Sequence, residues 1–177
     1  SPVAQTTRNR LRAILTTNSC QMVLVDTPGI HKPHHLLGER LVNSARSAVR
    51  EVDLVLLILE ANHPPGKGDE FIINFLKKEK VPVLVGLNKC DLLDKDIFKS
   101  RESAYKGLFL ECQWPTFFFS AKNGEGCNLI VDKISSSLPP GPHLYPSDIV
   151  SDQPEKILME ELIREQILIY TREEIPH

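Results

Sequence analysis

Short apolar runs alternate with amphipathic segments along most of the chain. Residues 54–59 and 81–87 are almost continuous apolar runs, a pattern typical of strands that are covered on both faces. Between them, residues 69–78 carry apolar side chains at helical spacing. The remaining pattern predicts strands at 10–15, 21–25 and 116–119 and helices at 96–110 and 129–138. This order predicts an α/β fold with a mostly parallel sheet and helices on both of its faces.

The pattern changes after residue 138. Residues 139–154 are rich in proline and are predicted to form an ordered linker. Asp152, with Glu155 three residues later, resembles a capping box at the start of a new helix. We therefore expect a first domain at 1–138, a linker at 139–154 and the start of a second domain at 155–177.

Composition narrows the choice of function. The chain has 177 residues, 41% of them hydrophobic, and a formal net charge of -2, so it has room for one domain and part of a second. The charge gives no sign of nucleic-acid binding, and contact with RNA would need a local basic patch. The four cysteines are scattered without a C-x-x-C pair, which argues against a zinc site or a disulfide framework. No apolar run is long enough to span a membrane.

The first candidate motif directly follows the predicted strand 21–25. It consists of Asp26, Thr27, Pro28 and Gly29. A carboxylate at the carboxyl end of a parallel strand faces the crevice where open α/β sheets bind ligands, and it can hold Mg²⁺ through water. A glycine lets its backbone N–H approach a terminal phosphate closely. An ordinary turn explains the same four residues equally well.

The second candidate motif follows the buried run at 81–87. It consists of Asn88, Lys89, Cys90 and Asp91. The Asp91 carboxylate can accept hydrogen bonds from N1–H and the 2-amino group of guanine, two donors that adenine lacks. The alkyl stem of Lys89 can lie over the purine face, and Asn88 can tie this loop to its neighbours. A polar turn without a ligand is the alternative.

The third candidate motif, Ser120, Ala121 and Lys122, follows the predicted strand 116–119. Its backbone N–H groups can meet the O6 atom of guanine, although a turn leading to Gly124 would explain it as well. The order of the three motifs decides between these interpretations, because each lies at the carboxyl end of a predicted strand. Together they resemble the third, fourth and fifth motifs of Ras-like GTPases.

Other segments extend this resemblance. Residues 5–8 resemble the first switch of the bacterial Era and MnmE-like GTPases, and residues 1–9 as a whole resemble the Era family. The linker residues 144–154 do so too, and the helix at 159–169 is similar to the start of the KH domain that follows in Era. The chain as a whole therefore resembles the Era family of Ras-like GTPases. Its segments 30–35 and 66–69 look most like cyanobacterial or plastid versions.

The resemblance implies a P-loop NTPase fold and a GTPase that uses Mg²⁺. It assigns catalytic roles to Thr7 and Gly29, and Mg²⁺ ligation to Thr7 directly and to Asp26 through water. The residues expected to bind GTP or GDP are Asp26, Thr27, Pro28, Gly29, Ile30, Asn88, Lys89, Cys90, Asp91, Ser120, Ala121 and Lys122. Ile30 stands where Ras has a water-orienting glutamine, and its side chain cannot orient water.

The same resemblance implies partners and a location. The expected partners are 16S-type rRNA and the small ribosomal subunit, with a role in its assembly, and it leaves room for a peripheral membrane association. The location would be the bacterial cytoplasm, or the chloroplast stroma for a plastid version. Two alternatives are a tRNA-modifying GTPase of the MnmE type and an interaction module that has lost nucleotide binding. The presence of both Asn88 and Asp91 argues against the second alternative.

Two parts of an Era protein are absent from the printed sequence. No G-x-x-x-x-G-K-[ST] phosphate loop occurs, and no GXXG loop for RNA follows residue 155. Because the chain begins at Ser1 without a Met, we expect a processed or partial sequence, with the phosphate loop upstream. In Ras-like folds the strand before that loop lies between the strand ending at Asp26 and the strand 54–59. We therefore expect the 177-residue chain alone to be marginally stable and to bind GTP weakly.

Overall fold

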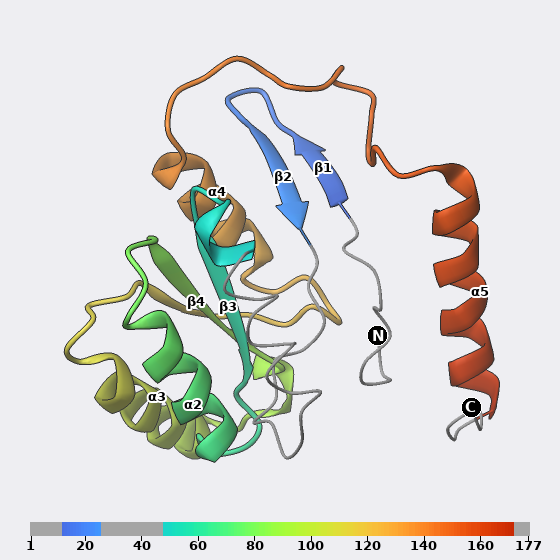
Figure 1. The fold of residues 1–177 in the computed structure, drawn as a ribbon. Helices are drawn as coiled ribbons and strands as arrows, with labels where there is room; N and C mark the ends of the chain where they lie inside the picture. The colour runs from blue at the N-terminus through green and yellow to red at the C-terminus, as the bar shows by residue number, and fades with distance from the viewer. Residues whose placement is uncertain (1–11, 26–47, 172–177) are drawn as a thin grey trace. The chain divides into compact units, whose positions relative to one another are not determined.

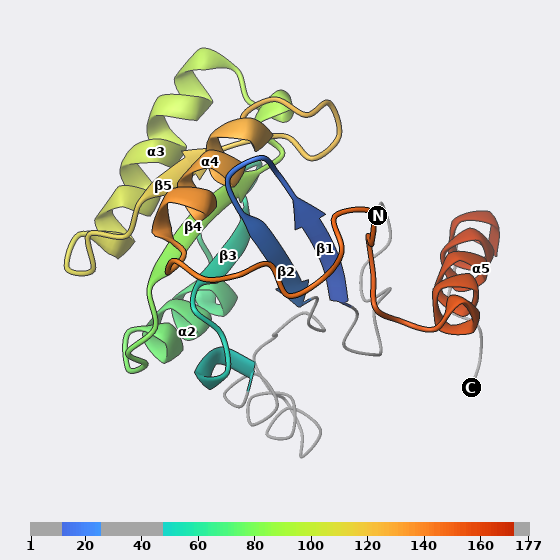
Figure 2. The same cartoon turned by 90° about the horizontal axis from the view of Figure 1, so that it is seen from above.

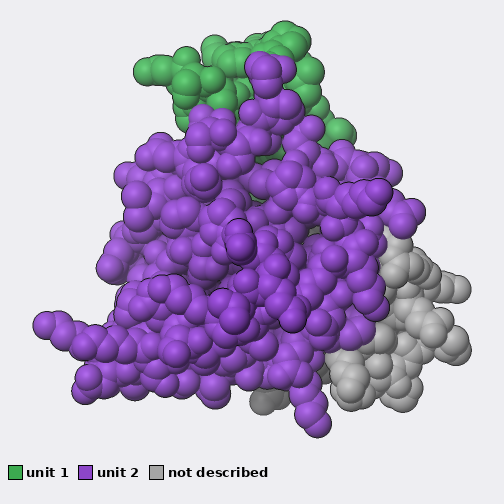
Figure 3. Space-filling view, turned by 90° about the vertical axis from the view of Figure 1, so that its left-hand side faces the viewer, with its two compact units in different colours: residues 1–29, 141–177 green, residues 30–140 purple. Residues whose placement is uncertain are grey.

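The computed structural model describes residues 12–25 and 48–171 (Figure 1). The chain divides into two compact units, residues 1–29 with 141–177, and residues 30–140 (Figure 3). In chain order the elements are β1 (Arg12–Thr16), β2 (Gln21–Val25), β3 (Val55–Glu60), α2 (Lys67–Leu76), β4 (Val83–Asn88), η1 (Cys90–Leu92), α3 (Lys95–Phe109), β5 (Thr116–Phe118), α4 (Cys127–Ser137) and α5 (Glu155–Thr171).

The unit of residues 30–140 is built on a parallel sheet with the order β3-β4-β5 (Figures 1 and 2). Leu57 pairs with Val85, and Leu87 pairs with Phe118. Parallel neighbours need a long crossover connection, which α2 supplies between β3 and β4 and α3 supplies between β4 and β5. The predicted α/β class with a parallel sheet is confirmed, and the apolar runs at 54–59 and 81–87 contain its strands β3 and β4. The expected cover on both faces holds for β4 but is wrong for β3, because Ile58 is 54% exposed.

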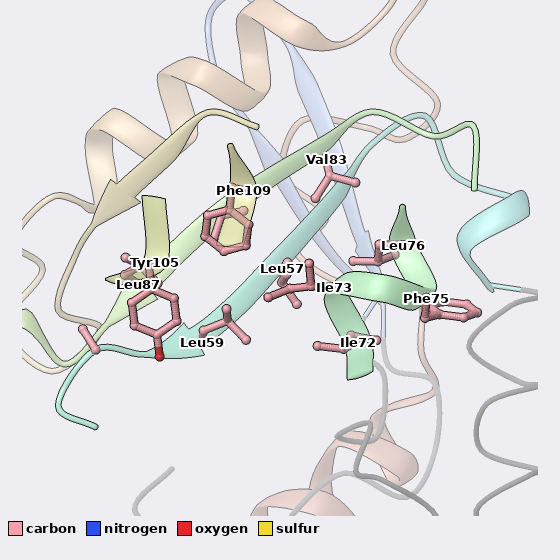
Figure 4. Close-up of a cluster of buried hydrophobic side chains, with 12 residues drawn as sticks. Leu57, Leu59, Ile72, Ile73, Phe75, Leu76, Val83, Leu87, Tyr105 and Phe109 are labelled. Carbon is pink, nitrogen blue, oxygen red and sulfur yellow. The ribbon is translucent and has the colours of Figure 1, made fainter. Parts of the chain in front are cut away.

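The main core lies between one face of this sheet and the helices α2 and α3 (Figure 4). Because side chains alternate along a strand, Val83, Val85 and Leu87 of β4 all enter this core. Helix α2 contributes an apolar stripe at helical spacing, and α3 contributes Tyr105 and Phe109. The expected amphipathic helix begins at Lys67 rather than at residue 69, since the Asp69 carboxylate accepts a hydrogen bond from the Gly66 backbone N–H at 2.7 Å.

Helix α4 packs on the other face of the sheet. Gly86 of β4 faces Phe119 and Ile130, and an added Cβ at Gly86 would lie 2.9 Å from the Phe119 ring. Both Phe119 and Ile130 are buried. Helices therefore cover both faces of the parallel sheet, as expected, and the absence of a side chain at Gly86 permits the close approach of the Phe119 ring.

The strands β1 and β2 form a separate antiparallel pair, with Ile14 opposite Val23. A turn joins them, in which the Thr17 backbone N–H donates to the Cys20 carbonyl at 2.8 Å. The described strands thus form two sheets, and β1 and β2 do not run parallel. Sequence periodicity located both strands but contained no information on their direction, which follows from the short connection between them.

The linker is anchored on this β-hairpin by the side-chain amide of Gln21. Its Oε1 accepts hydrogen bonds from the backbone N–H groups of Leu144 and Tyr145, at 2.8 and 2.9 Å. Its Nε2 donates to the Tyr145 carbonyl at 2.8 Å and to the Thr16 hydroxyl at 3.0 Å. One side chain therefore satisfies backbone groups of a segment more than a hundred residues away, as a neighbouring strand would.

The same linker covers the outer edge of β1. The Ile14 backbone N–H donates to the Val150 carbonyl at 2.8 Å, and the Ser151 hydroxyl donates to the Arg12 carbonyl at 2.6 Å. The Arg12 guanidinium lies 3.1 Å from the carboxylate of Asp152. These contacts protect an edge that would otherwise present unpaired N–H and C=O groups. The hairpin and the linker belong to the same compact unit. The predicted domain boundary at residue 138 stays a prediction.

The capping box predicted at Asp152 is wrong. The Asp152 carboxylate accepts a hydrogen bond from the Tyr145 hydroxyl at 2.8 Å and pairs with Arg12. This hydrogen bond to the carboxylate raises the pKa of the Tyr145 hydroxyl. Helix α5 begins three residues later, and its first turn closes on the Pro154 carbonyl, which accepts from Ile157 N–H at 2.9 Å. No helix in the described residues is long and apolar enough to cross a membrane.

Replacing the amide of Gln21 should release the linker from the hairpin. Gln21→Ala removes acceptors for two backbone N–H groups and a donor to the Tyr145 carbonyl. We expect amide hydrogen exchange at Leu144 and Tyr145 to accelerate by about tenfold, since each hydrogen bond contributes about 0.5–1.5 kcal/mol. Gln21→Glu keeps the acceptors and should restore part of the protection. Unchanged exchange in Gln21→Ala would contradict this account.

Candidate functional site

The carboxyl ends of the three parallel strands lie at one edge of the sheet. Glu60, the last residue of β3, is in register with Asn88, the last residue of β4. Leu87 is in register with Phe118, the last residue of β5. The two candidate motifs that follow β4 and β5 are therefore brought together at the edge where open α/β sheets bind ligands.

The side chain of Asn88 joins the two motifs. Its Oδ1 atom accepts hydrogen bonds from the Lys89 N–H at 2.8 Å and from the Ala121 N–H at 3.0 Å. Its backbone carbonyl accepts from the Ala61 N–H at 2.8 Å. Because both bonds to Oδ1 come from N–H donors, the amide orientation is fixed and Nδ2 faces away from them as a donor. Asn88 thus connects the loops after all three strands.

The backbone turns sharply after Asn88. Lys89 adopts the left-handed conformation with φ of 67°, and the 3₁₀ turn η1 follows. The Cys90 N–H donates to the Phe119 carbonyl at 3.2 Å, which is a second link between the two loops. Asp91 is exposed, and within the described part of the chain no donor engages its carboxylate. The carboxylate is therefore open to a ligand that offers two donors.

The thiol of Cys90 is not a candidate nucleophile. Burial raises its pKa above the usual value, and the Glu125 and Asp91 carboxylates raise it further. The protonated thiol is a weak nucleophile. Cys90 therefore contributes to the loop through its backbone, and the chemistry of this motif rests on Asn88, Lys89 and Asp91.

The third motif is held by a tight turn. Ser120 is fully buried, its N–H donates to the Glu125 carbonyl at 2.8 Å, and its carbonyl accepts from Gly124 N–H at 2.9 Å. The Ala121 N–H is already bonded to Asn88. The sequence suggested that backbone N–H groups of this motif can meet guanine O6, but the N–H groups of Ser120 and Ala121 are bonded within the protein. No acceptor among the described residues engages the Lys122 N–H, so it is the one of these three groups that can serve a ligand.

Sequence reasoning did not single out Glu60. Its carboxylate lies 2.6 Å from the Lys89 ammonium, at the same edge of the sheet. The sequence contains one clue to Glu60: it is an acidic residue directly after the apolar run 54–59, and the next predicted strand is the one that ends at the Asn88 motif. That signal is weak without the register, because charged residues often end strands.

The remaining predicted site residues lie outside the described residues. They are Thr7, Asp26, Thr27, Pro28, Gly29 and Ile30. The Mg²⁺ site assigned to Thr7 and Asp26 is among them, and hydroxyl and carboxylate oxygens are the hard ligands that Mg²⁺ prefers. Over residues 12–25 and 48–171, no three His, Cys, Asp or Glu side chains gather in a way that could hold a metal ion.

Comparison with known proteins fits the geometry of the two loops. The family described as "50S ribosome-binding GTPase" matches residues 1–89. GTPase Era of Synechocystis sp. is 50% identical over 177 residues, which are 100% of this chain and 56% of that protein. The chain belongs to the Era family of GTPases. This relative fits the expected cyanobacterial type, and the chain spans just over half of its length.

Solved Era structures agree with the fold. Era in complex with MgGDPNP and nucleotides 1506–1542 of 16S ribosomal RNA is 32% identical with a TM-score of 0.86, covering 99% of this chain and 60% of that one. Era from Aquifex aeolicus bound to GDP·AlF4− is 31% identical with a TM-score of 0.85, covering the same shares. The fold is therefore that of an Era P-loop GTPase, and these relatives favour the Era interpretation over the MnmE alternative.

Truncating Asn88 should loosen both loops. Asn88→Ala leaves the N–H groups of Lys89 and Ala121 without their acceptor. We expect the free energy of unfolding to fall by about 1–3 kcal/mol, measured by urea denaturation. Asn88→Asp retains an acceptor oxygen and should cost less. Equal losses in the two variants would show that the bridging hydrogen bonds do not carry the effect.

Proposed function

We propose that this protein is a GTP-binding and GTP-hydrolysing switch of the Era type. The observation that carries the proposal is the Asn88 bridge, which joins the loops after β4 and β5 while the Asp91 carboxylate stays open. A guanine offers N1–H and a 2-amino group side by side, which suit one carboxylate. Adenine offers neither donor and would leave the carboxylate unpaired, so the site favours GTP over ATP.

Hydrolysis of GTP to GDP and phosphate rests on the motif residues at the other end of the nucleotide. Thr7 and Asp26 would hold Mg²⁺, which when bound offsets the negative charge that develops on the phosphates. Gly29 would bring its backbone N–H to the terminal phosphate. Because Ile30 cannot orient water, another group must position the attacking water in this protein.

We extend the proposal to small-subunit rRNA and to assembly of the small ribosomal subunit. Its support is the likeness over 99% of this chain to an Era structure that contains a 16S rRNA fragment. Helix α5 would begin the KH-type domain that contacts RNA. The protein would act in the bacterial cytoplasm, or in the chloroplast stroma for a plastid version.

Nucleotide competition on the natural full-length protein tests the first part. With Mg²⁺ present, GTP should displace a fluorescent GDP analogue at a concentration about 10⁴-fold lower than ATP, the discrimination expected of a site that hydrogen-bonds its ligand. The protein should also release phosphate from GTP. Equal competition by ATP and GTP would remove the basis for the proposal.

A second measurement tests the RNA partner. Binding of a 3′-terminal 16S rRNA fragment is compared with binding of a 23S rRNA fragment of equal length at one salt concentration, because phosphate contacts alone are strongly salt-dependent. We expect the 16S fragment to bind more tightly. Equal or tighter binding of the 23S fragment would contradict the small-subunit assignment.

A further inference from the structure

Glu60 engages a residue of the proposed guanine site. Its carboxylate pairs with the Lys89 ammonium at 2.6 Å, and the two side chains are 55% and 41% exposed. We propose that Glu60 is a positioning residue of this site, which holds the Lys89 ammonium so that the alkyl stem lies across the purine face. This inference rests on the proposed function, since it names a new residue for GTP and GDP binding.

The backbone of Glu60 is fixed from several sides. Glu60 is paired in register with Asn88, and the next residue, Ala61, donates its N–H to the Asn88 carbonyl at 2.8 Å. The Glu60 carbonyl accepts the hydroxyl of Tyr105 at 3.0 Å. Tyr105 is 1% exposed and packs in the core beside Leu59 (Figure 4). Burial raises the pKa of Tyr105 to about 12, so its hydroxyl stays a donor at physiological pH.

Lys89 is a side chain that needs such support. A lysine carries a flexible four-carbon stem, and ordering it costs conformational entropy. The left-handed backbone at Lys89 defines where the stem begins, and the Glu60 carboxylate defines where it ends. Because the ammonium group is paired with Glu60, Lys89 would contact the ligand through its apolar stem.

The expected effect is modest because the pair is partly exposed. In the natural full-length protein, Glu60→Gln should weaken binding of GTP and of GDP by the same factor, about two- to fivefold in Kd. The equal factor is the signature of a role at the base, since a role at the phosphates would change the GTP-to-GDP ratio. The weakening should shrink at high salt, as it does for exposed ion pairs.

A double-mutant cycle separates positioning from a general effect on the fold. In a Lys89→Met background, Glu60→Gln should have no further effect on Kd, because its partner is gone. Glu102→Gln is the matched control, since Glu102 pairs with Lys106 at 2.7 Å within α3. It removes an ion pair of similar length from the same unit and should leave nucleotide binding unchanged.

The outcomes distinguish this inference from the proposed function. Unchanged or tighter GTP binding in Glu60→Gln, with a wild type that binds GTP, overturns the positioning role and leaves the proposed function in place. An equal loss in the Lys89→Met background also overturns it, because Glu60 would then act without Lys89. A wild type that does not bind GTP overturns both.

Discussion

Asp91→Asn should lower the affinity of the natural full-length protein for GTP by about 100- to 1,000-fold. The open carboxylate would accept two charge-assisted hydrogen bonds from guanine. Hydrogen bonds to a charged group contribute about 1.5–3 kcal/mol each, so losing the charge and turning one acceptor into a donor costs about 3–4 kcal/mol in total. Isothermal titration with GTP and GDP measures the change.

The same variant should gain affinity for xanthosine nucleotides. Xanthine carries a 2-oxo group where guanine carries the 2-amino group, and the new amide at residue 91 can donate to it. Asp132→Asn is the control, because Asp132 is an exposed aspartate on α4 whose substitution makes the same change in charge. Loss of GTP affinity in Asp132→Asn, or no gain for the xanthosine nucleotide in Asp91→Asn, would contradict the assigned role of Asp91.

Gly126→Ala should lower the free energy of unfolding by about 2–4 kcal/mol. Gly126 has φ of 73° at the start of α4, and an added Cβ would lie 2.5 Å from the Phe118 carbonyl oxygen. The left-handed conformation and the steric conflict both oppose a side chain here. Because the conflict lies beside the loop of Ser120 and Ala121, GTP affinity should fall as well. Urea denaturation and nucleotide titration measure the two effects.

Gly107→Ala is the matched control for this variant. Gly107 lies in α3, and an added Cβ there would have nothing within 4 Å. Alanine is a better helix former than glycine, so the free energy of unfolding should rise by about 0.5–1 kcal/mol. A loss of stability in Gly107→Ala similar to that in Gly126→Ala would mean that the conflict at Phe118 is not the cause.

Sequence pattern was sufficient for the parallel sheet because apolar residues fill most positions of β3 and β4, and β4 is buried at every residue before Asn88. The runs at 54–59 and 81–87 became β3 and β4, and the motif of Asn88 falls at the end of its strand. The anchoring of the linker could not be predicted in this way. It depends on the side chain of Gln21 meeting the backbone of Tyr145, and such a contact leaves no periodic signal in either segment.

The sequence motifs showed which residues follow strand ends, but not how the loops that contain them are connected. The motifs of Asn88 and Ser120 were placed after predicted strands, and in the structure they follow β4 and β5, since strand ends are visible in a sequence. The use of the Ala121 N–H by Asn88 and the pairing of Lys89 with Glu60 depend on the register between strands. Register is set by long-range packing, so it is visible only in the folded chain.

The attachment of the linker to the hairpin also restricts its length. A flexible tether can gain or lose residues at little cost, because the entropy of a loop grows slowly with length. Here Tyr145 is fixed on Gln21, while Val150 and Ser151 are fixed on β1. The residues between them must span one set distance, so an insertion or deletion at 146–149 would detach one end. This stretch should therefore keep a constant length among related chains even where its residues differ.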